Sequence, residues 1–274
     1  MVTARGFKHK NLNVYGRDKS RYDRAYFFYG DFVAKRNVVF VHGTGNDALF
    51  QTYDLFFRLL ESGYNVASFD LDGHGAVGQS YFDSETILAS TIEKIEQLLG
   101  QSLDDSCTII GNSLGGCLVS QALADGFLKN VDSVVLVAVP FCVKISPLLA
   151  AKELASLVYA DLWSQISRWS AKDLLPAIGR FNRRKFPIRF SEQKSDLKYI
   201  EIVSKIIEKY PVHKSMERHE LKTLAVYGDE DLLAYPHRDI DDLPNVRQRF
   251  VNSNHFMMLY QPSTIDLILD FLEA

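Results

Sequence analysis

Short, mainly apolar runs alternate with longer amphipathic stretches along most of this chain of 274 residues. The apolar runs are residues 37–41, 64–69, 107–110, 134–139 and 223–227, and a more polar run follows at residues 246–251. Runs of this length predict strands, and those that are apolar throughout are typical of strands buried on both faces of a parallel sheet. The stretches at residues 50–60, 84–99, 117–124 and 262–272 predict helices. Strands that alternate with helices indicate an α/β fold with a mostly parallel, doubly wound sheet.

Two segments depart from this alternation. Residues 5–33 alternate aromatic and polar side chains, which predicts antiparallel edge strands and brings the expected sheet to about eight strands. Residues 141–221 carry helical patterns interrupted by prolines and show no strand signal. We therefore expect an α/β core formed by residues 1–140 and 222–274, and a helical cap inserted at residues 141–221.

Five polar or glycine-rich loops directly follow predicted strands. They are residues 42–45, 70–75, 111–116, 228–231 and 252–255. In a doubly wound sheet, the chemistry takes place at the carboxyl ends of the strands. We therefore expect these five loops to contribute to one site.

The loop at residues 111–116 reads Gly-Asn-Ser-Leu-Gly-Gly and lies between a predicted strand and a predicted helix. In this context the pattern Gly-x-Ser-x-Gly is typical of a nucleophile elbow, a sharp turn that presents a serine at the N-terminus of a helix. Ser113 is therefore the candidate nucleophile. The alternative is a tight turn in which Ser113 only caps the helix, because so short a pattern also occurs by chance. A serine nucleophile needs a histidine to accept its proton, and His255 follows the last predicted strand.

With these motifs, nearly the whole chain resembles enzymes of the α/β-hydrolase fold. In that family the nucleophile, the acid and the histidine follow one another in this order, which Ser113, Asp231 and His255 match. Asp229 follows the same strand as Asp231, and the family's spacing after Gly228 favours Asp231. Within the family, the chain resembles most the carboxylesterases, monoacylglycerol lipases and serine aminopeptidase-like hydrolases.

The resemblance also implies where the rest of the site lies. Residues 42–45, His-Gly-Thr-Gly, resemble the family's oxyanion loop, so the backbone N–H groups of Thr44 and Leu114 are the expected oxyanion donors. Residues 70–75 resemble the family's Asp-x-x-Gly-His-Gly segment, which implies a structural role for Asp70 and Asp72.

The expected activity is hydrolysis of a small or medium-sized carboxylic ester through an acyl-enzyme. The same triad would also serve an acyltransferase, an amidase or an enzyme that hydrolyses a carbon–carbon bond, and the fold is also used by non-catalytic binding proteins. Trp163, Trp169 and Phe181 in the predicted cap are candidates for the apolar lining of the substrate pocket, or alternatively for the core of the cap.

Composition and charge indicate which binding partners and which cellular compartment to expect for this protein. Hydrophobic residues make up 47% of the chain, and the net charge of −3 gives no electrostatic reason to expect nucleic acid or an anionic membrane as a partner. No apolar run approaches the length of a membrane span, and residues 1–20 lack the apolar centre of a signal peptide. Three cysteines, of which two lie in apolar segments, predict buried free thiols and a reducing, cytoplasmic location. No histidine or cysteine spacing indicates a metal site, and no cofactor is expected.

Overall fold

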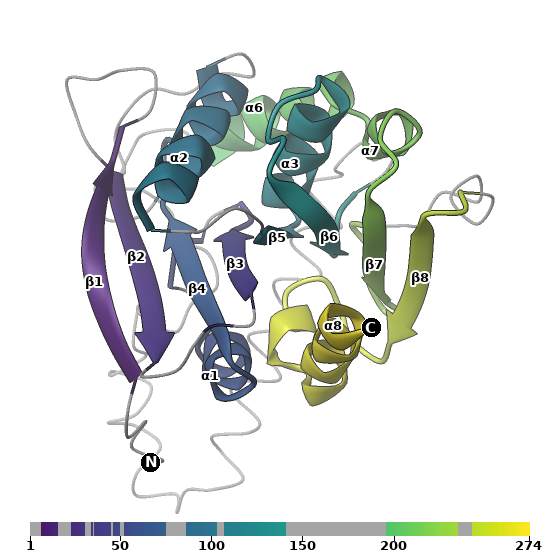
Figure 1. Cartoon of the computed structure of the whole chain (residues 1–274). Coiled ribbons are helices and arrows are strands. Elements are labelled where there is room, and N and C mark those ends of the chain that lie inside the picture. The colour runs from purple at the N-terminus through teal and green to yellow at the C-terminus, as the bar shows by residue number, and fades with distance from the viewer. Residues whose placement is uncertain are drawn as a thin grey trace, which may run out of the picture.

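In the computed structural model, eight strands form one sheet in the order β1-β2-β4-β3-β5-β6-β7-β8 (Figure 1). The structure describes residues 7–15, 23–30, 34, 36–44, 46–49, 52–74, 86–102, 107–140, 196–234 and 243–274. The strands are β1 (Phe7–Val14), β2 (Asp23–Gly30), β3 (Arg36–Val41), β4 (Tyr64–Phe69), β5 (Cys107–Asn112), β6 (Val131–Val137), β7 (Lys222–Gly228) and β8 (Val246–Val251). The helices are α1 (Tyr53–Glu61), α2 (Thr86–Ser102), α3 (Leu114–Ala124), α6 (Asp196–Lys209), α7 (Val212–Met216) and α8 (Pro262–Glu273), with a short 3-10 helix η3 (Met258–Tyr260).

The six strands β4, β3, β5, β6, β7 and β8, named here in their order across the sheet, are all parallel. Strand β3 pairs with β4 and β5, and the remaining pairs are β5 with β6, β6 with β7 and β7 with β8. Strand β2 pairs antiparallel with both β1 and β4. The prediction of a mostly parallel sheet of about eight strands with antiparallel edge strands near the N-terminus is therefore confirmed.

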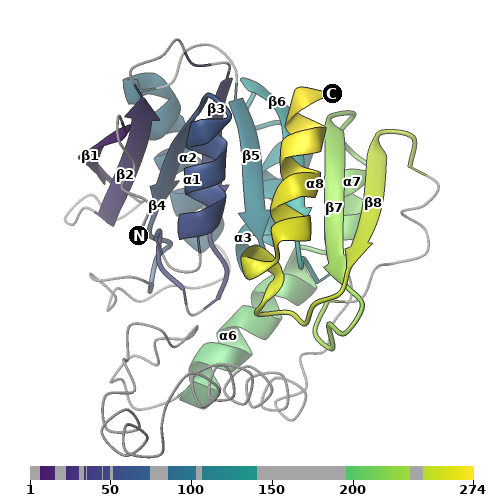
Figure 2. The same cartoon turned by 90° about the horizontal axis from the view of Figure 1, so that it is seen from below.

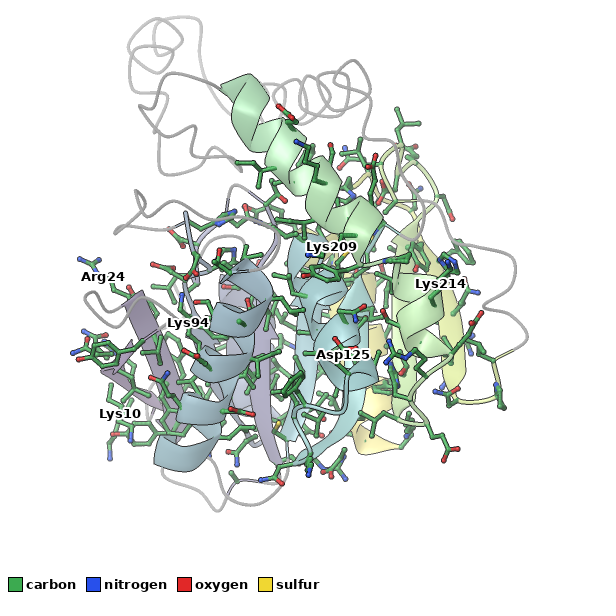
Figure 3. The ribbon with its side chains drawn as sticks, turned by 90° about the horizontal axis from the view of Figure 1, so that it is seen from above. Lys10, Arg24, Lys94, Asp125, Lys209 and Lys214 are labelled. Carbon is green, nitrogen blue, oxygen red and sulfur yellow. The ribbon has the colours of Figure 1, made fainter. Side chains whose placement is uncertain are left out.

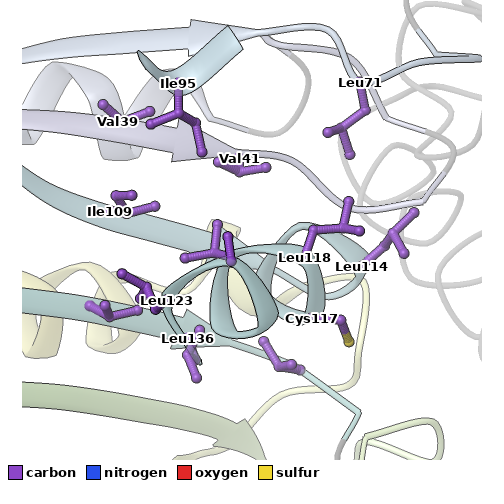
Figure 4. Packing of buried hydrophobic residues seen from close by; sticks show 14 of the residues in the cluster. Val39, Val41, Leu71, Ile95, Ile109, Leu114, Cys117, Leu118, Leu123 and Leu136 are labelled. Carbon is purple, nitrogen blue, oxygen red and sulfur yellow. The ribbon is translucent and has the colours of Figure 1, made fainter. Parts of the chain in front are cut away.

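Side chains of the central strands alternate between two hydrophobic layers, because successive residues of a strand point to opposite faces of the sheet. On one face, Val39, Ile109 and Leu136 belong to a cluster with the buried sides of α2 and α3 (Figure 4). On the other face, Phe40 and Ile110 belong to a cluster with α1 and α8, which cover this face in Figure 2. Because helices cover both faces of the sheet, side chains on both faces of the central strands are removed from water, and this explains why these strands are apolar throughout.

The parallel strands end at one edge of the sheet, and in Figure 2 the arrowheads of β5, β7 and β8 point towards the end of the molecule where α6 lies. The loops that follow β3, β4, β5, β7 and β8 therefore meet at this edge, as the sequence predicts. These loops contain the residues of the candidate site.

Part of the predicted cap is described, and it is helical. Helix α7 packs beside α3, where Val212 and Met216 join the same hydrophobic cluster as α3, and the Ser215 hydroxyl donates to Gln121 Oε1 at 2.9 Å. Residues 141–195 lie outside the described residues, so the boundary of the cap at residues 141–221 stays a prediction.

Two further expectations concern cysteines and membranes. Cys107 and Cys117 are buried free thiols, as predicted, whereas Cys142 lies outside the described residues. Within the described part of the chain, every helix is too short or too polar to cross a membrane.

Candidate active site

Ser113 lies at the sharp turn between β5 and α3. Its backbone has φ 47° and ψ −116°, a strained conformation for a residue with a side chain, and its N–H donates to the carbonyl of Val137 at 2.9 Å. The turn also requires small neighbours, because a Cβ atom on Gly111 would lie 2.6 Å from Gly116 Cα. The glycines of the motif thus allow the close approach that presents the Ser113 hydroxyl at the carboxyl edge of the sheet.

The N-terminus of α3 lies against the loop that follows β3. A Cβ atom on Gly115 would lie 2.4 Å from the carbonyl oxygen of Val41 and 2.5 Å from that of His42, so only glycine fits here. A Cβ atom on Gly43 would lie 3.1 Å from Ser113 Cβ. The predicted oxyanion loop and the predicted nucleophile are therefore neighbours in space.

His255 reaches Ser113 from the loop between β8 and η3. Its Nε2 atom lies 3.1 Å from Ser113 Oγ, within hydrogen-bond distance. The loop that carries it is held by the Asn254 side chain, whose Oδ1 accepts the N–H of Met257 at 3.0 Å.

Asp231 lies on the opposite side of the His255 ring from Ser113. Its Oδ2 atom lies 2.9 Å from His255 Nδ1, and its Oδ1 atom accepts the N–H groups of Leu233 and Ala234, each at 2.8 Å. The Asp231 side chain is fully buried, whereas Asp229 is exposed. A carboxylate that accepts from Nδ1 leaves Nε2 free to accept the proton of the serine hydroxyl.

The acid loop and the histidine loop are attached to each other through their backbones. The N–H of Glu230 donates to the carbonyl of Ser253 at 3.1 Å, and a Cβ atom on Gly228 would lie 2.1 Å from that same oxygen. This close approach fixes the separation of Asp231 and His255, and it explains why glycine ends β7.

His42, the first residue of the oxyanion loop, and His74 are both buried, and their ring centroids are 5.2 Å apart. Burial, with a smaller contribution from the nearby Lys94 ammonium, lowers the pKa of His74 from its ordinary 6.5 to about 4. Burial and the neighbouring His74 hold the pKa of His42 well below its ordinary value. Both rings are therefore neutral near neutral pH.

The expected oxyanion donors belong to the two loops that lie against each other at Gly43 and Ser113. Leu114 is the first residue of α3, where N–H groups have no acceptor within the helix, and Thr44 follows Gly43 in the loop after β3. Trp163, Trp169 and Phe181 lie outside the described residues.

Lys94 is the residue of this region that the sequence analysis missed. It is buried on α2 and reaches the turn after β4, in which Asp70 and Asp72 lie. A lysine on the apolar face of an amphipathic helix is the signal that would have identified it. Among the described residues, no cluster of three or more histidine, cysteine, aspartate or glutamate side chains could hold a metal ion.

Comparison with known proteins identifies the family of the chain. The sequence matches the α/β hydrolase family over residues 38–264, a range that includes every described residue of the site. A curated relative, the probable lysophospholipase BODYGUARD 4 of Arabidopsis thaliana, is 32% identical over 106 residues. That match covers 38% of this chain and 25% of the relative, so the similarity extends over only a quarter of the length of that protein.

Solved structures of similar fold include two esterases and a serine hydrolase. An esterase from Pyrococcus furiosus has a TM-score of 0.66 at 15% identity, with 97% of this chain and 91% of that chain covered. An esterase from Exiguobacterium antarcticum has a TM-score of 0.66 at 16% identity, with 97% and 100% covered. A serine hydrolase from the bacterium Cycloclasticus zankles has a TM-score of 0.66 at 15% identity, with 97% and 98% covered. At these identities the structures show a common fold.

Because the family match spans most of the sequence, the chain belongs to the α/β hydrolase family.

Proposed function

We propose that this protein is a serine hydrolase that cleaves carboxylic esters with a triad of Ser113, His255 and Asp231. The observation that carries the proposal is the unbroken row of hydrogen-bond distances from Ser113 Oγ to His255 Nε2, 3.1 Å, and from His255 Nδ1 to Asp231 Oδ2, 2.9 Å. Membership of a hydrolase family and the esterase folds among similar structures support hydrolysis as the reaction class.

In the first half of the reaction, Ser113 Oγ attacks the carbonyl carbon of the ester while its proton moves to His255 Nε2. Asp231 stabilises the imidazolium that forms and keeps Nδ1 protonated throughout. The tetrahedral intermediate then collapses, the bond to the alcohol breaks, and His255 returns the proton to the leaving alcohol. The product of this half is an acyl group on Ser113.

The negative charge on the tetrahedral intermediate needs donors that are already in position. The N–H of Leu114 at the start of α3 is one proposed donor, and the N–H of Thr44 is the other. Each such donor contributes about 3–4 kcal/mol to transition-state stabilisation in enzymes of this kind. Because both are backbone groups, their orientation depends on the neighbouring turns rather than on their own side chains.

In the second half, water attacks the acyl carbon and His255 Nε2 accepts its proton. Collapse of the second tetrahedral intermediate breaks the bond to Ser113 Oγ, which takes the proton back from His255. The free acid leaves, and the resting state returns.

The substrate is proposed only by class, a small or medium-sized ester or a related acyl compound. Trp163, Trp169 and Phe181 of the proposed cap are candidates for the apolar lining of the pocket. The name of the plant relative, a probable lysophospholipase, makes single-chain phospholipids a sensible part of any substrate panel. The buried thiols of Cys107 and Cys117 support a reducing compartment, and we propose the cytoplasm.

Steady-state hydrolysis of p-nitrophenyl esters from short to long acyl chains, together with lysophosphatidylcholine and p-nitroanilides, tests the proposal. We expect a clear preference for esters over anilides and an optimum at one chain length. Ser113→Ala should lower kcat by a factor of about 10⁴ to 10⁶ without changing the melting temperature much. A variant that retains near wild-type activity would contradict the assignment of Ser113.

A further inference from the structure

A buried polar cluster lies behind the oxyanion loop and takes no part in the proton transfers described above. It consists of four buried residues, His42, Asp70, His74 and Lys94, and of the half-buried Asp72. The Lys94 side chain is fully buried, and Figure 3 shows this residue on α2, the helix that runs beside α3 above the sheet. An ammonium group at a fully buried position requires an explanation, because removing it from water costs several kcal/mol.

The hydrogen bonds of His42 define which of its ring nitrogens carries the proton. The N–H of Leu71 donates to His42 Nε2 at 2.9 Å, so Nε2 acts as the acceptor. His42 Nδ1 therefore carries the hydrogen and donates to the carbonyl oxygen of Gly43 at 2.8 Å. The turn after β4 thus fixes the ring, and the ring fixes the carbonyl of Gly43.

Fixing this carbonyl also fixes the N–H of Thr44. The peptide between Gly43 and Thr44 is trans, since the described residues contain no cis peptide bond. In a trans peptide the C=O and the following N–H point in opposite directions. The Thr44 N–H therefore points away from the His42 ring, and a Cβ atom on Gly43 would lie 3.1 Å from Ser113 Cβ, which places this peptide beside the nucleophile.

Lys94 holds the turn that starts this series of contacts. Its Nζ atom donates to the carbonyl of Asp70 at 2.9 Å and to Asp72 Oδ1 at 2.6 Å. The Ser90 hydroxyl, one turn earlier on α2, donates to the same Asp72 oxygen at 2.8 Å. Leu71 lies between the two residues that Lys94 binds, so the position of its N–H depends on the ammonium group.

The end of β4 and the turn that follows it also contact the chain just after the oxyanion loop, at Ala48. Asp70 Oδ1 accepts the N–H of Ala48 at 2.8 Å, and the Ser68 hydroxyl donates to the carbonyl of Ala48 at 2.8 Å. The loop after β3 is therefore tied to the end of β4 both through His42 and through Ala48. A displacement of the turn would be transmitted to both ends of the loop.

We propose that Lys94 is a positioning residue for the oxyanion hole: it holds the turn after β4, and through Leu71 and His42 it directs the N–H of Thr44 towards the reacting carbonyl. This inference rests on the proposed serine hydrolase function. A purely structural role predicts that removing the ammonium group lowers the stability of the protein but leaves transition-state stabilisation unchanged in the folded enzyme. The proposal instead requires that the ammonium group affect transition-state stabilisation.

The test compares Lys94→Met with the wild type by kcat, KM and the Ki of a trifluoromethyl ketone. Ser113 Oγ adds to the ketone carbon, its proton moves to His255, and the carbonyl electron pair forms an oxyanion that only the oxyanion donors stabilise. We expect kcat to fall by about tenfold or more, KM to change by less than about threefold, and Ki to rise by the same factor as kcat falls. All rates are expressed per active site titrated with a fluorophosphonate, so unfolded protein does not contribute.

A double-mutant cycle tests the route through His42. We expect Lys94→Met to lower kcat by less than about threefold in a His42→Ala background, because both substitutions release the same peptide. Arg58→Met is the matched control: it removes the Arg58 cation of α1 from an exposed ion pair with Asp266 of α8, 2.8 Å long, and should leave kcat and Ki unchanged. Should Lys94→Met fail to fold, Asp72→Asn, which keeps the side-chain volume, should raise Ki and lower kcat together by about threefold or more.

The positioning role would be overturned if kcat and Ki were unchanged in folded Lys94→Met or Asp72→Asn protein. It would also be overturned if the factors by which Lys94→Met and His42→Ala lower kcat multiplied in the double variant. These results are distinct from a failure of the proposed function. In that case the wild type itself would neither hydrolyse esters nor react with the fluorophosphonate.

Discussion

The carboxylate of Asp231 binds the His255 ring with one oxygen and its own backbone turn with the other. Oδ2 lies 2.9 Å from His255 Nδ1, while Oδ1 accepts two N–H groups of the following residues at 2.8 Å each. Because the two N–H groups hold Oδ1, the backbone turn orients the carboxylate without help from His255. It also gives a direct way to test which aspartate is the acid of the proposed triad.

Asp231→Asn should lower kcat by about 10⁴-fold with little change in the melting temperature. The amide oxygen can still accept from the turn, which leaves the amide nitrogen facing His255 Nδ1. An N–H donor at this position favours the tautomer with the proton on Nε2, so the ring can no longer accept the proton of Ser113. Steady-state kinetics on a p-nitrophenyl ester measures the loss.

Asp229→Asn is the matched control, because Asp229 is exposed and lies two positions earlier in the same loop. We expect it to cost less than about tenfold in kcat. The reverse ranking of the two variants would assign the acid of the triad to Asp229.

A pair of glycine substitutions tests the close approach of α3 to the oxyanion loop. Gly115→Ala would bring a methyl group to 2.4 Å from the carbonyl oxygen of Val41, so it should destabilise the protein by about 1–3 kcal/mol and lower activity. Gly100→Ala on α2 meets nothing within 4 Å and should stabilise the protein by about 0.5–1 kcal/mol. The midpoints of urea unfolding distinguish the two, and a Gly115→Ala variant as stable as Gly100→Ala would show that the close approach is wrong.

The buried His74 should make stability depend on pH. Its pKa is about 4 in the folded protein against an ordinary 6.5, so between these values the unfolded chain binds a proton that the folded chain does not. This contribution is therefore complete above pH 6.5 and is lost progressively as the pH falls towards 4. Urea unfolding across this range should show a flatter pH dependence for His74→Gln than for the wild type, and identical slopes would contradict the assignment.

The two described cysteines should be inert in the folded protein. Burial raises the pKa of the Cys107 thiol to about 12, and burial also raises the pKa of Cys117. Since the thiolate is the reactive form, iodoacetamide should modify neither residue under native conditions and both after unfolding in urea. Peptide mass mapping separates them from Cys142, and rapid native labelling of Cys117 would show that the packing around it is looser than described.

The order of elements and the placement of the site could be predicted from the sequence because both depend on local patterns. Apolar runs that end in glycine and polar residues mark buried strands and the loops at their carboxyl ends, and the loops with Ser113, Asp231 and His255 were found in this way. The choice between Asp231 and Asp229 depended on spacing, and the structure brings Asp231 to His255.

The buried polar cluster could not be predicted in full, because it depends on which side chains of distant elements meet. The buried face of α2 nevertheless carries Ile87, Thr91, Lys94 and Leu98, at positions three or four residues apart. A lysine in such a row, together with aspartates after the preceding strand, indicates a buried ion pair between the helix and the turn. The positive φ of Ala138, 50°, could not be predicted from the sequence at all. The N–H of Ala138 donates to the carbonyl of Val226 at 2.9 Å, and this contact depends on the pairing of β6 with β7.

The proposed function depends above all on Ser113 being a nucleophile that His255 activates, and covalent labelling with a fluorophosphonate followed by peptide mass mapping measures this most directly. Attack by Ser113 Oγ on phosphorus expels fluoride and leaves a stable adduct, while the serine proton moves to His255. We predict one adduct per chain on Ser113, none in Ser113→Ala, and labelling slowed by orders of magnitude in His255→Ala. An unlabelled wild type, an adduct on another residue, or equal labelling rates with and without His255 would contradict the account.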